Sequence, residues 1–341
     1  MKLNVVTKTL HPRNVFRISR AARGEVRNVF VEISKGGISG TGEASPNLFY
    51  DETAPNVSGL LKAAAAFVAT LRIETVADIE RAWFEVWPWF APSRAAQCAL
   101  DLALWDWLAR SKGLSVSELA LGQHPHPVRT FCTVGISDFA ELENKVEELR
   151  GFPLIKIKSD ALADMAPIDY VRKQTGAALA VDANGAWGNV DVAALSRILA
   201  KQGVLFIEQP LSAARDERMP DLLATSELPI LADESCVTTE DVERMQGCYS
   251  GFNIKLVKCG GLTPALAMAR RGRELGLRTM VGCMLESSLL IAAGAVVAQQ
   301  TDFADLDGAW LLRDDPFVGL PLRQGVIEPA LGPGFGVELA E

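Results

Sequence analysis

The stretch ALAVDANGAWGNVDVAALSRILAKQGVLFIEQP (178–210) decides the fold of this chain. It opens and closes with short apolar runs, ALAVDAN (178–184) and VLFIEQP (204–210), and both runs end in polar residues. Between them, NVDVAALSRILAKQG (189–203) places apolar residues at helical spacing and ends in Gly203, a helix stop signal. The stretch therefore predicts one strand–helix–strand unit with two parallel strands.

The same unit recurs along the chain as a repeat of structure rather than of sequence. The runs that we expect to be strands are RTFCTVGI (129–136), LIKIKS (154–159), ALAVDAN (178–184), VLFIEQP (204–210), PILADES (229–235), FNIKLVK (252–258), RTMVGCML (278–285) and FADLDG (303–308). Helix-like segments fill the gaps, and a Pro- and Gly-rich tail follows the last run. Eight parallel strands are the number that closes a TIM-type α/β barrel. A doubly wound open sheet is the alternative.

The N-terminal part has a different organisation. VFRIS (15–19), VRNVFVEI (26–33) and the turn-rich KGGISGTGEA (35–44) predict an antiparallel meander. Alanine-rich helical segments follow, among them 93–113, in which Trp105 and Trp107 are expected to serve packing. These features are typical of an α+β domain.

The domain boundaries follow from these patterns and from the segment GQHPHPV, whose alternating prolines predict an extended linker. We expect an α+β capping domain over 1–125, completed by the C-terminal tail at about 315–341, and a barrel catalytic domain over 126–314. A length of 341 residues suits such a barrel with a smaller second domain.

Composition narrows the partners and the compartment. The net charge of −8 argues against a nucleic-acid partner or an anionic membrane surface. The longest apolar run, 289–298, is too short to cross a bilayer. Six cysteines without a C-x-x-C pair predict free thiols in a reducing compartment, so we expect a cytoplasmic protein. The oligomeric state stays open, a homo-oligomer included.

Charged residues end nearly every expected strand of the barrel. They are Lys156, Lys158, Asp182, Glu208, Asp233, Lys255, Asp305 and Asp307. Active sites of such barrels lie at the C-terminal ends of the strands, so these residues predict a site. The structural alternative is a mutually neutralising ion-pair network. The chain has only three histidines and none after 126, which excludes histidine-based zinc sites and Ser-His-Asp triads from the later two-thirds.

Three of these carboxylates are candidate metal ligands. Asp182, Glu208 and Asp233 end three successive strands, so they should converge on one side of the barrel mouth. Hard oxygen ligands without histidine or cysteine suit Mg²⁺, with Mn²⁺ as an alternative.

The lysines are candidate acid–base groups. Lys156 and Lys158 alternate along one strand and point to the same face, while Lys255 ends a strand on the opposite side of the barrel. Crowding by Lys156 should lower the pKa of Lys158, so that Lys158 acts as a base near neutral pH. A carbon acid held between Lys158 and Lys255 could lose a proton to one and regain a proton from the other. The expected reaction is proton abstraction α to a carboxylate or carboxamide through a metal-stabilised enolate.

Several motifs of the chain resemble those of the muconate-lactonising subgroup of the enolase superfamily. They are K-x-K (156–158), VDANGAW (181–187), IEQP (207–210), ADES (232–235), NIKLVKCGGLT (253–263), TGE (41–43) and GPGFG (332–336). The resemblance covers essentially the whole chain. It implies a modified TIM barrel, (β/α)7β, with an N-terminal α+β capping domain. It also implies Mg²⁺ ligation by Asp182, Glu208 and Asp233, and the acid–base pair Lys158 and Lys255.

The eighth strand indicates which reaction of the subgroup to expect. Asp305 and Asp307 would bind a substrate ammonium group, and an aspartate pair there is similar to the dipeptide epimerases. We expect an isomerase, an L-Ala-D/L-Glu epimerase that inverts the second residue by two-base 1,1-proton transfer. Such a dipeptide would come from murein peptide metabolism or from general peptide use. The alternative is a cycloisomerase or lyase on the same scaffold, resembling muconate cycloisomerase or o-succinylbenzoate synthase.

We expect the capping loops to determine which second residue of the dipeptide the enzyme prefers. A glutamate side chain needs a cation, and the loop ISRAARGE (18–25) offers Arg20 and Arg23, of which we choose Arg20. Family members often carry a Tyr-Gly pair in the second capping loop, whereas Asp51 follows Tyr50 here and could weaken glutamate binding. Thr133, on the first barrel strand, is a further candidate for the substrate pocket.

Overall fold

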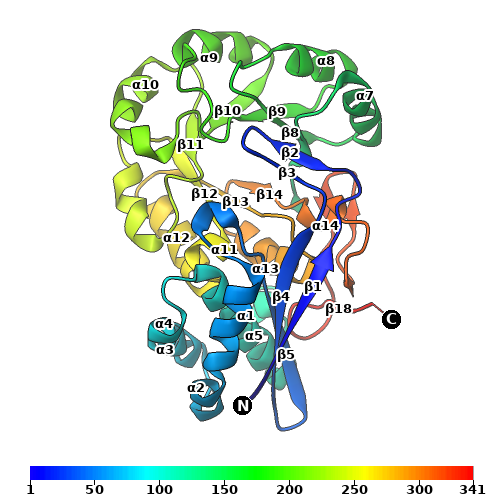
Figure 1. The fold of residues 1–341 in the computed structure, drawn as a ribbon, viewed down its shortest axis with the longest axis vertical. Coiled ribbons are helices and arrows are strands. Elements are labelled where there is room, and N and C mark those ends of the chain that lie inside the picture. The colour runs from blue at the N-terminus through cyan, green and yellow to red at the C-terminus, as the bar shows by residue number, and fades with distance from the viewer. Residues whose placement is uncertain (341) are drawn as a thin grey trace.

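A computed structural model describes residues 1–340 and shows two sheets of different kind (Figure 1). The barrel strands and their helices occupy the upper part of the view, from green to orange. An antiparallel sheet with its own helices, in blue and cyan, lies below and reaches the barrel mouth with a hairpin. No helix among residues 1–340 has both the length and the apolar character needed to cross a membrane.

Eight parallel strands, hydrogen-bonded in chain order, form the barrel. They are β7 (Cys132–Val134), β8 (Leu154–Lys158), β9 (Ala178–Asp182), β10 (Val204–Glu208), β11 (Ile230–Ala232), β12 (Gly251–Lys255), β13 (Arg278–Gly282) and β14 (Phe303–Asp305). Each overlaps one of the expected runs. The backbone N–H of Phe131 donates to Ala304 O over 2.8 Å, which joins the two edges of the sheet. The expected barrel is confirmed, and the open sheet is not formed.

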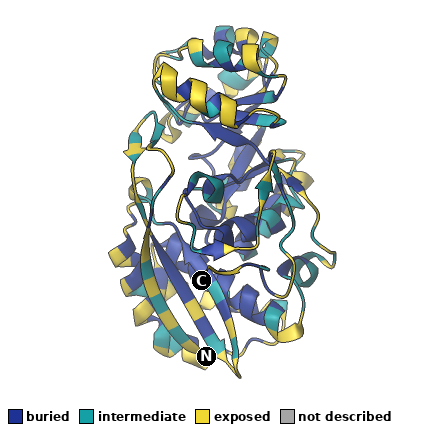
Figure 2. Ribbon diagram, turned by 90° about the vertical axis from the view of Figure 1, so that its right-hand side faces the viewer, coloured by how far each residue is buried: buried dark blue, intermediate teal, exposed yellow. Residues whose placement is uncertain are grey.

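Helices connect the strands and cover the outside of the barrel. They are α7 (Phe139–Glu148), α8 (Ala166–Gln174), α9 (Val192–Lys201), η2 (Ala213–Arg218), α10 (Met219–Thr225), η3 (Thr239–Met245), α11 (Leu256–Cys259), α12 (Leu262–Glu274) and α13 (Ser288–Ala298). The predicted unit 178–210 forms as expected: Asp191 caps α9 by accepting from Ala194 N, and Gly203 follows with φ 73°. Only the single turn α14 (Gly308–Leu311) follows β14, which gives the (β/α)7β pattern. Figure 2 shows buried strands inside and exposed helix faces outside.

The capping sheet differs from the expected meander in one respect. Its order is β1 (Lys2–Leu10), β4 (Val26–Lys35) and β5 (Ile38–Ala44), all antiparallel. The run VFRIS instead forms β2 (Phe16–Ile18), which pairs only with β3 (Ala21–Arg23). The reason is that a tight turn at 19–20 folds this segment back on itself, so β1 takes the place beside β4.

Helices complete the capping domain. They are η1 (Leu48–Tyr50), α1 (Ala54–Ala63), α2 (Ala65–Thr70), α3 (Val76–Glu85), α4 (Trp87–Phe90), α5 (Arg94–Lys112) and α6 (Val116–Leu121). The tail adds β15 (Phe317–Val318), β16 (Leu322–Arg323), β17 (Val326–Ile327) and β18 (Glu338–Leu339). It contacts both parts: Phe317 stacks 5.8 Å from Phe30 on β4, and β17 pairs with β6 (Val128–Arg129).

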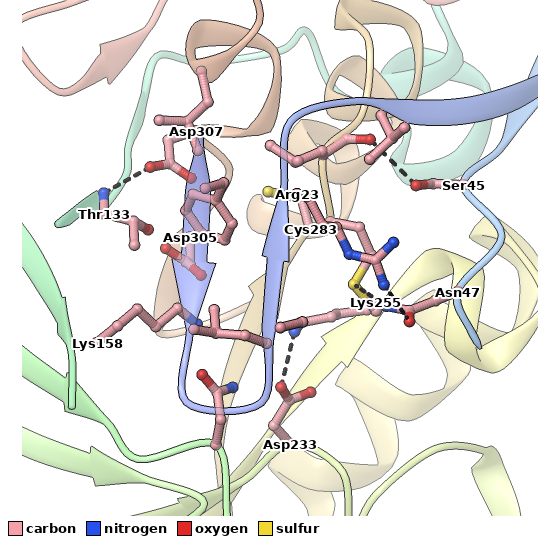
Figure 3. Close-up of a pocket in the computed structure, with 18 of the residues that line it drawn as sticks. Arg23, Ser45, Asn47, Thr133, Lys158, Asp233, Lys255, Cys283, Asp305 and Asp307 are labelled. Carbon is pink, nitrogen blue, oxygen red and sulfur yellow. Dashed lines mark hydrogen bonds and ion pairs between the residues drawn. The ribbon is translucent and has the colours of Figure 1, made fainter. Parts of the chain in front are cut away.

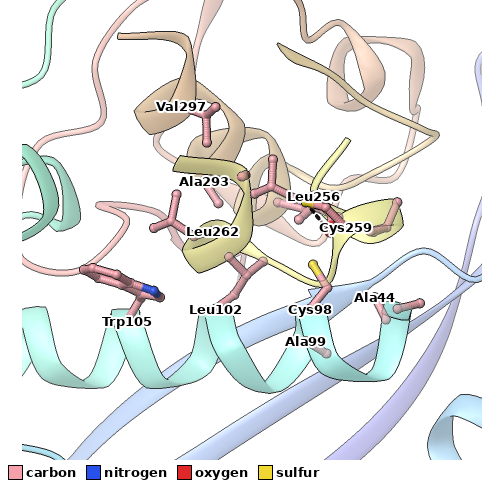
Figure 4. Close-up of a cluster of buried hydrophobic side chains, with 14 of the residues drawn as sticks. Ala44, Cys98, Ala99, Leu102, Trp105, Leu256, Cys259, Leu262, Ala293 and Val297 are labelled. Carbon is pink, nitrogen blue, oxygen red and sulfur yellow. Dashed lines mark hydrogen bonds between the residues drawn. The ribbon is translucent and has the colours of Figure 1, made fainter. Parts of the chain in front are cut away.

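Helix α5 joins the two parts of the molecule. One side packs on β5, where Gly40 and Gly42 let the helix backbone approach the strand, and the other side packs on α11, α12 and α13 (Figure 4). The buried Asp101 accepts from Thr263 N over 3.0 Å and from Thr263 Oγ1 over 2.6 Å. Trp105 is 2% exposed and donates to the same hydroxyl, which confirms its expected packing role.

The close approach at Gly42 predicts a large stability effect. A Cβ at this position would lie 1.9 Å from Ala99 O on α5, so Gly42→Ala forces the helix away from the strand. We expect it to lower the free energy of unfolding by at least about 1–3 kcal/mol in urea titrations. Gly59→Ala is the matched control, because no atom lies within 4 Å of its added Cβ. Equal stability of the two variants would contradict the packing described here.

Candidate active site

Three buried carboxylates meet at the C-terminal end of the barrel. Asp182 ends β9, Glu208 ends β10 and Asp233 follows β11, and one carboxylate oxygen from each lies within 4.8 Å of the others. Parallel register brings this about, since Asp182 is paired with Glu208 across β9 and β10. Convergence of these side chains was the expectation from the sequence.

The electrostatics of this cluster suit a divalent cation. Burial and the charge of Asp182 raise the pKa of Glu208 to about 7, so the three carboxylates disfavour one another's charge. Burial also opposes the charge of Asp233, but Lys255 and Lys258 hold its pKa well below the usual range. A cluster of three hard carboxylate oxygen atoms that disfavour one another's charge fits Mg²⁺ in donor type.

Two lysines, Lys158 and Lys255, point into the cavity from opposite sides (Figure 3). Lys158, at the end of β8, donates to Asp182 Oδ2 over 2.5 Å, and Lys255, at the end of β12, donates to Asp233 Oδ2 over 2.8 Å. Both side chains line the same cavity. The arrangement places an amine on each side of a bound molecule, as expected for the pair.

Lys156 lies deeper and is paired differently from the expectation. Its Nζ donates to Glu208 Oε2 over 3.0 Å and to Asp305 Oδ2, with Asp182 Oδ2 at 3.8 Å. Burial opposes its charge, but these carboxylates raise the pKa of Lys156 well above its ordinary value. Its charge is therefore compensated by neighbouring carboxylates, and its effect on Lys158 stays a prediction.

Asp305 and Asp307 form a second acidic group at the cavity wall. Asp305 Oδ1 is buried and has no hydrogen-bond partner among residues 1–340. Asp307 Oδ2 accepts from the backbone N–H of Thr133 over 2.6 Å, and Thr133 also lines the cavity. Burial and the charge of Asp305 raise the pKa of Asp307 to about 6. Free acceptor capacity on two adjacent carboxylates can hold a cationic group of a ligand.

The hairpin β2–β3 lies over the cavity and carries both candidate arginines. Arg20 donates to Asn184 O over 2.9 Å, forms an ion pair with Glu234 and lies 4.3 Å from the centre of the Phe49 ring. Arg23 donates to the neutral Oδ1 of Asn47 over 3.0 Å and makes no ion pair with a carboxylate of residues 1–340. Of the two, Arg23 is the cation that remains available to a ligand.

Two findings concern residues that the sequence misjudged or missed. Asp51 is exposed, caps η1 in a left-handed conformation and does not line the cavity, whereas Tyr50 does. Lys258 is fully buried and donates to Asp233 O over 2.6 Å and to Asp233 Oδ1 over 2.7 Å. It orients this carboxylate, and its signal was the second lysine of NIKLVK.

Comparisons with known proteins agree with this geometry. Residues 2–122 match the family "Mandelate racemase / muconate lactonizing enzyme, N-terminal domain", and residues 139–341 match "Enolase C-terminal domain-like". An L-Ala-D/L-amino acid epimerase of Flavobacterium johnsoniae is 38% identical over 99% of this chain and 100% of its own length.

Solved structures show the same likeness. An enolase family member from Agrobacterium tumefaciens with homology to dipeptide epimerases, bound to sodium and L-Ala-L-Glu, is 34% identical with a TM-score of 0.87, over 96% of this chain and 98% of its own. A dipeptide epimerase from Enterococcus faecalis, complexed with Mg and L-Leu-L-Tyr, is 28% identical with a TM-score of 0.91, over 98% of both chains.

Metal binding to the three carboxylates is testable by stability. Mg²⁺ at about 100 times its dissociation constant should raise the free energy of unfolding by about 2.7 kcal/mol, because it binds the folded chain. Asp182→Asn should lose most of this gain in thermal unfolding with and without Mg²⁺. Asp221→Asn, an exposed change on α10, is the control. An equal Mg²⁺ effect in both variants would exclude Asp182 as a ligand.

Proposed function

The chain belongs to the mandelate racemase / muconate lactonizing enzyme family, and from this premise we propose that it is a Mg²⁺-dependent dipeptide epimerase, an isomerase acting on L-Ala-D/L-Glu and related dipeptides. The observation that carries the proposal is the placement of Lys158 and Lys255 on opposite sides of one cavity, next to a metal-binding triad. Whole-chain similarity to epimerases supports it. A pure binding protein would not need two opposed amines.

The residues of the cavity suggest how a dipeptide lies. Asp305 and Asp307 would hold the free ammonium group, since both are buried carboxylates with acceptor capacity to spare. The carboxylate of the second residue would face Asp182, Glu208 and Asp233, and Mg²⁺ bound there would offset the negative charge that develops when the α-proton leaves. The α-carbon of the second residue would then lie between Lys158 and Lys255.

The two lysine amines account for both protons that move in the reaction. A neutral lysine on one face takes the α-proton as the C–H bond breaks, and the ammonium of the other lysine gives a proton to the opposite face. The configuration of the second residue is inverted, and the two lysines exchange protonation states. The reverse reaction uses the same groups in exchanged roles.

Binding of the second residue's side chain is assigned to Arg23 rather than to Arg20. Arg20 is already neutralised by Glu234, and it anchors the hairpin to the barrel through Asn184 O. Arg23 faces the same cavity with only an amide oxygen as partner, so it could pair with a glutamate carboxylate.

The alternative of a cycloisomerase or lyase is not favoured. Such substrates lack an ammonium group, and they would leave Asp307 and the unpartnered Oδ1 of Asp305 buried against the ligand without a donor. We place the enzyme in the cytoplasm, because its cysteines are free thiols, four of them buried. A strict preference for L-Ala-D/L-Glu would indicate murein peptide metabolism, and a broad range would indicate general peptide use.

The central test follows α-proton exchange by NMR, with L-Ala-L-Glu and Mg²⁺ in D₂O. We expect loss of the second residue's α-proton signal and appearance of L-Ala-D-Glu. Lys158→Ala and Lys255→Ala should each lower the epimerisation rate by about 10²–10⁴-fold, because each removes an acid–base group. Lys201→Ala, at an exposed position of α9, is the control. Epimerisation at the unmodified rate in either cavity variant would refute the two-base scheme.

The arginine assignment is tested with paired substrates. Arg23→Met should lower kcat/KM for L-Ala-L-Glu about 10- to 100-fold more than for L-Ala-L-Leu, since it removes one charge-assisted contact. Arg20→Met should affect both dipeptides alike, because it loosens the hairpin. A loss confined to L-Ala-L-Glu in Arg20→Met, but not in Arg23→Met, would return the role to Arg20.

A further inference from the structure

A second cavity adjoins the catalytic cavity beside Asp307. It is open to solvent and lies between the segment before β2, the end of β7 and helix α7. Phe16, Thr133 and Leu311 line both cavities and so form the boundary between them. The backbone of Thr133 is also the donor to Asp307, so the second cavity starts next to the proposed ammonium site.

The walls of this second cavity suit an apolar group. Arg17 pairs with Glu141 over 2.9 Å, and Lys145 lies 4.1 Å above the centre of the Trp310 ring with Glu148 at 3.7 Å. Arg13 also lines the cavity; it donates to Leu312 O over 3.2 Å and lies 5.6 Å from the centre of the Trp310 ring, and it makes no ion pair with a carboxylate of residues 1–340. Both carboxylates of the lining are therefore already paired, and neither is free to hold a cationic ligand group.

The uncharged part of the lining is largely aliphatic or aromatic, including Val15, Phe16, Val134 and Ile136. A cationic side chain entering here would lose hydration without gaining a free counter-ion, whereas an apolar one would bury surface.

We propose that this cavity receives the side chain of the dipeptide's first residue and favours an apolar side chain larger than the methyl group of alanine. The inference rests on the proposed function, because it needs the substrate ammonium at Asp305 and Asp307. The first side chain branches from the carbon that carries this ammonium, so it must start close to Thr133. Arg23, proposed for the second side chain, lies away from Thr133 and Asp307 in the same cavity (Figure 3).

The test compares L-Leu-L-Glu with L-Ala-L-Glu in two variants of α7. Asn144 is exposed and lines the second cavity, whereas its neighbour Glu143 is exposed and does not. Asn144→Phe fills the cavity, so the ratio of kcat/KM for L-Leu-L-Glu to that for L-Ala-L-Glu should fall about tenfold or more. Glu143→Phe should leave this ratio unchanged. Ser137→Phe, on another wall, should repeat the effect of Asn144→Phe.

The outcomes separate this inference from the proposed function. Turnover of L-Leu-L-Glu at least as efficient as that of L-Ala-L-Glu, with the selective loss in both filling variants, supports the assignment. Turnover of L-Ala-L-Glu alone, or an unchanged ratio in both filling variants, overturns it while leaving the epimerase proposal intact. Absence of α-proton exchange on both dipeptides overturns the proposed function and this assignment with it.

Discussion

Compensation of buried charge at the barrel mouth is the constraint on which the rest of this structure depends. Parallel register sets Lys158 against Asp182 and Asp182 against Glu208; the two carboxylates are buried, and Lys158 is partly buried. An unpaired charge there would destabilise the fold by several kcal/mol, so each lysine must find a carboxylate. Lys156 meets this requirement between Glu208 and Asp305. The same compensation leaves a cluster that a cation and a charged substrate can complete.

The capping part depends on this barrel for its position. Buried α5 packs between the capping sheet and α11–α13, and Glu43 on β5 accepts from Asn28 on β4 and from Ser287 before α13. Burial raises the pKa of Glu43 to about 7, as expected for a carboxyl held in an apolar interface. The hairpin β2–β3 makes its own contact with the barrel, through the bond from Arg20 to Asn184 O. In the proposed function, barrel residues supply the reacting groups and hairpin residues select the substrate.

The structure differs from the sequence-based expectations mainly in which partners the charged side chains have. The sequence does not distinguish the two arginines of this loop. In the structure, Arg20 forms an ion pair with Glu234, whereas Arg23 donates only to the side-chain amide oxygen of Asn47. Asp51 follows Tyr50 directly, but its left-handed backbone turns it to solvent. Lys258 has no catalytic placement, and it still determines how Asp233 is oriented.

The sequence by itself determined the eight strand–helix units, the charges at the strand ends and the opposed lysines. These follow from periodicity and from the alternation of side chains along a strand, which are local properties of the chain. Only the tertiary structure decided that Lys156 is paired with Asp305, that Arg20 is paired with Glu234, and that a second cavity opens beside Thr133. Ion-pair partners and cavities depend on distances between segments far apart in the chain, and these distances are set only when the hairpin and helices pack against the barrel.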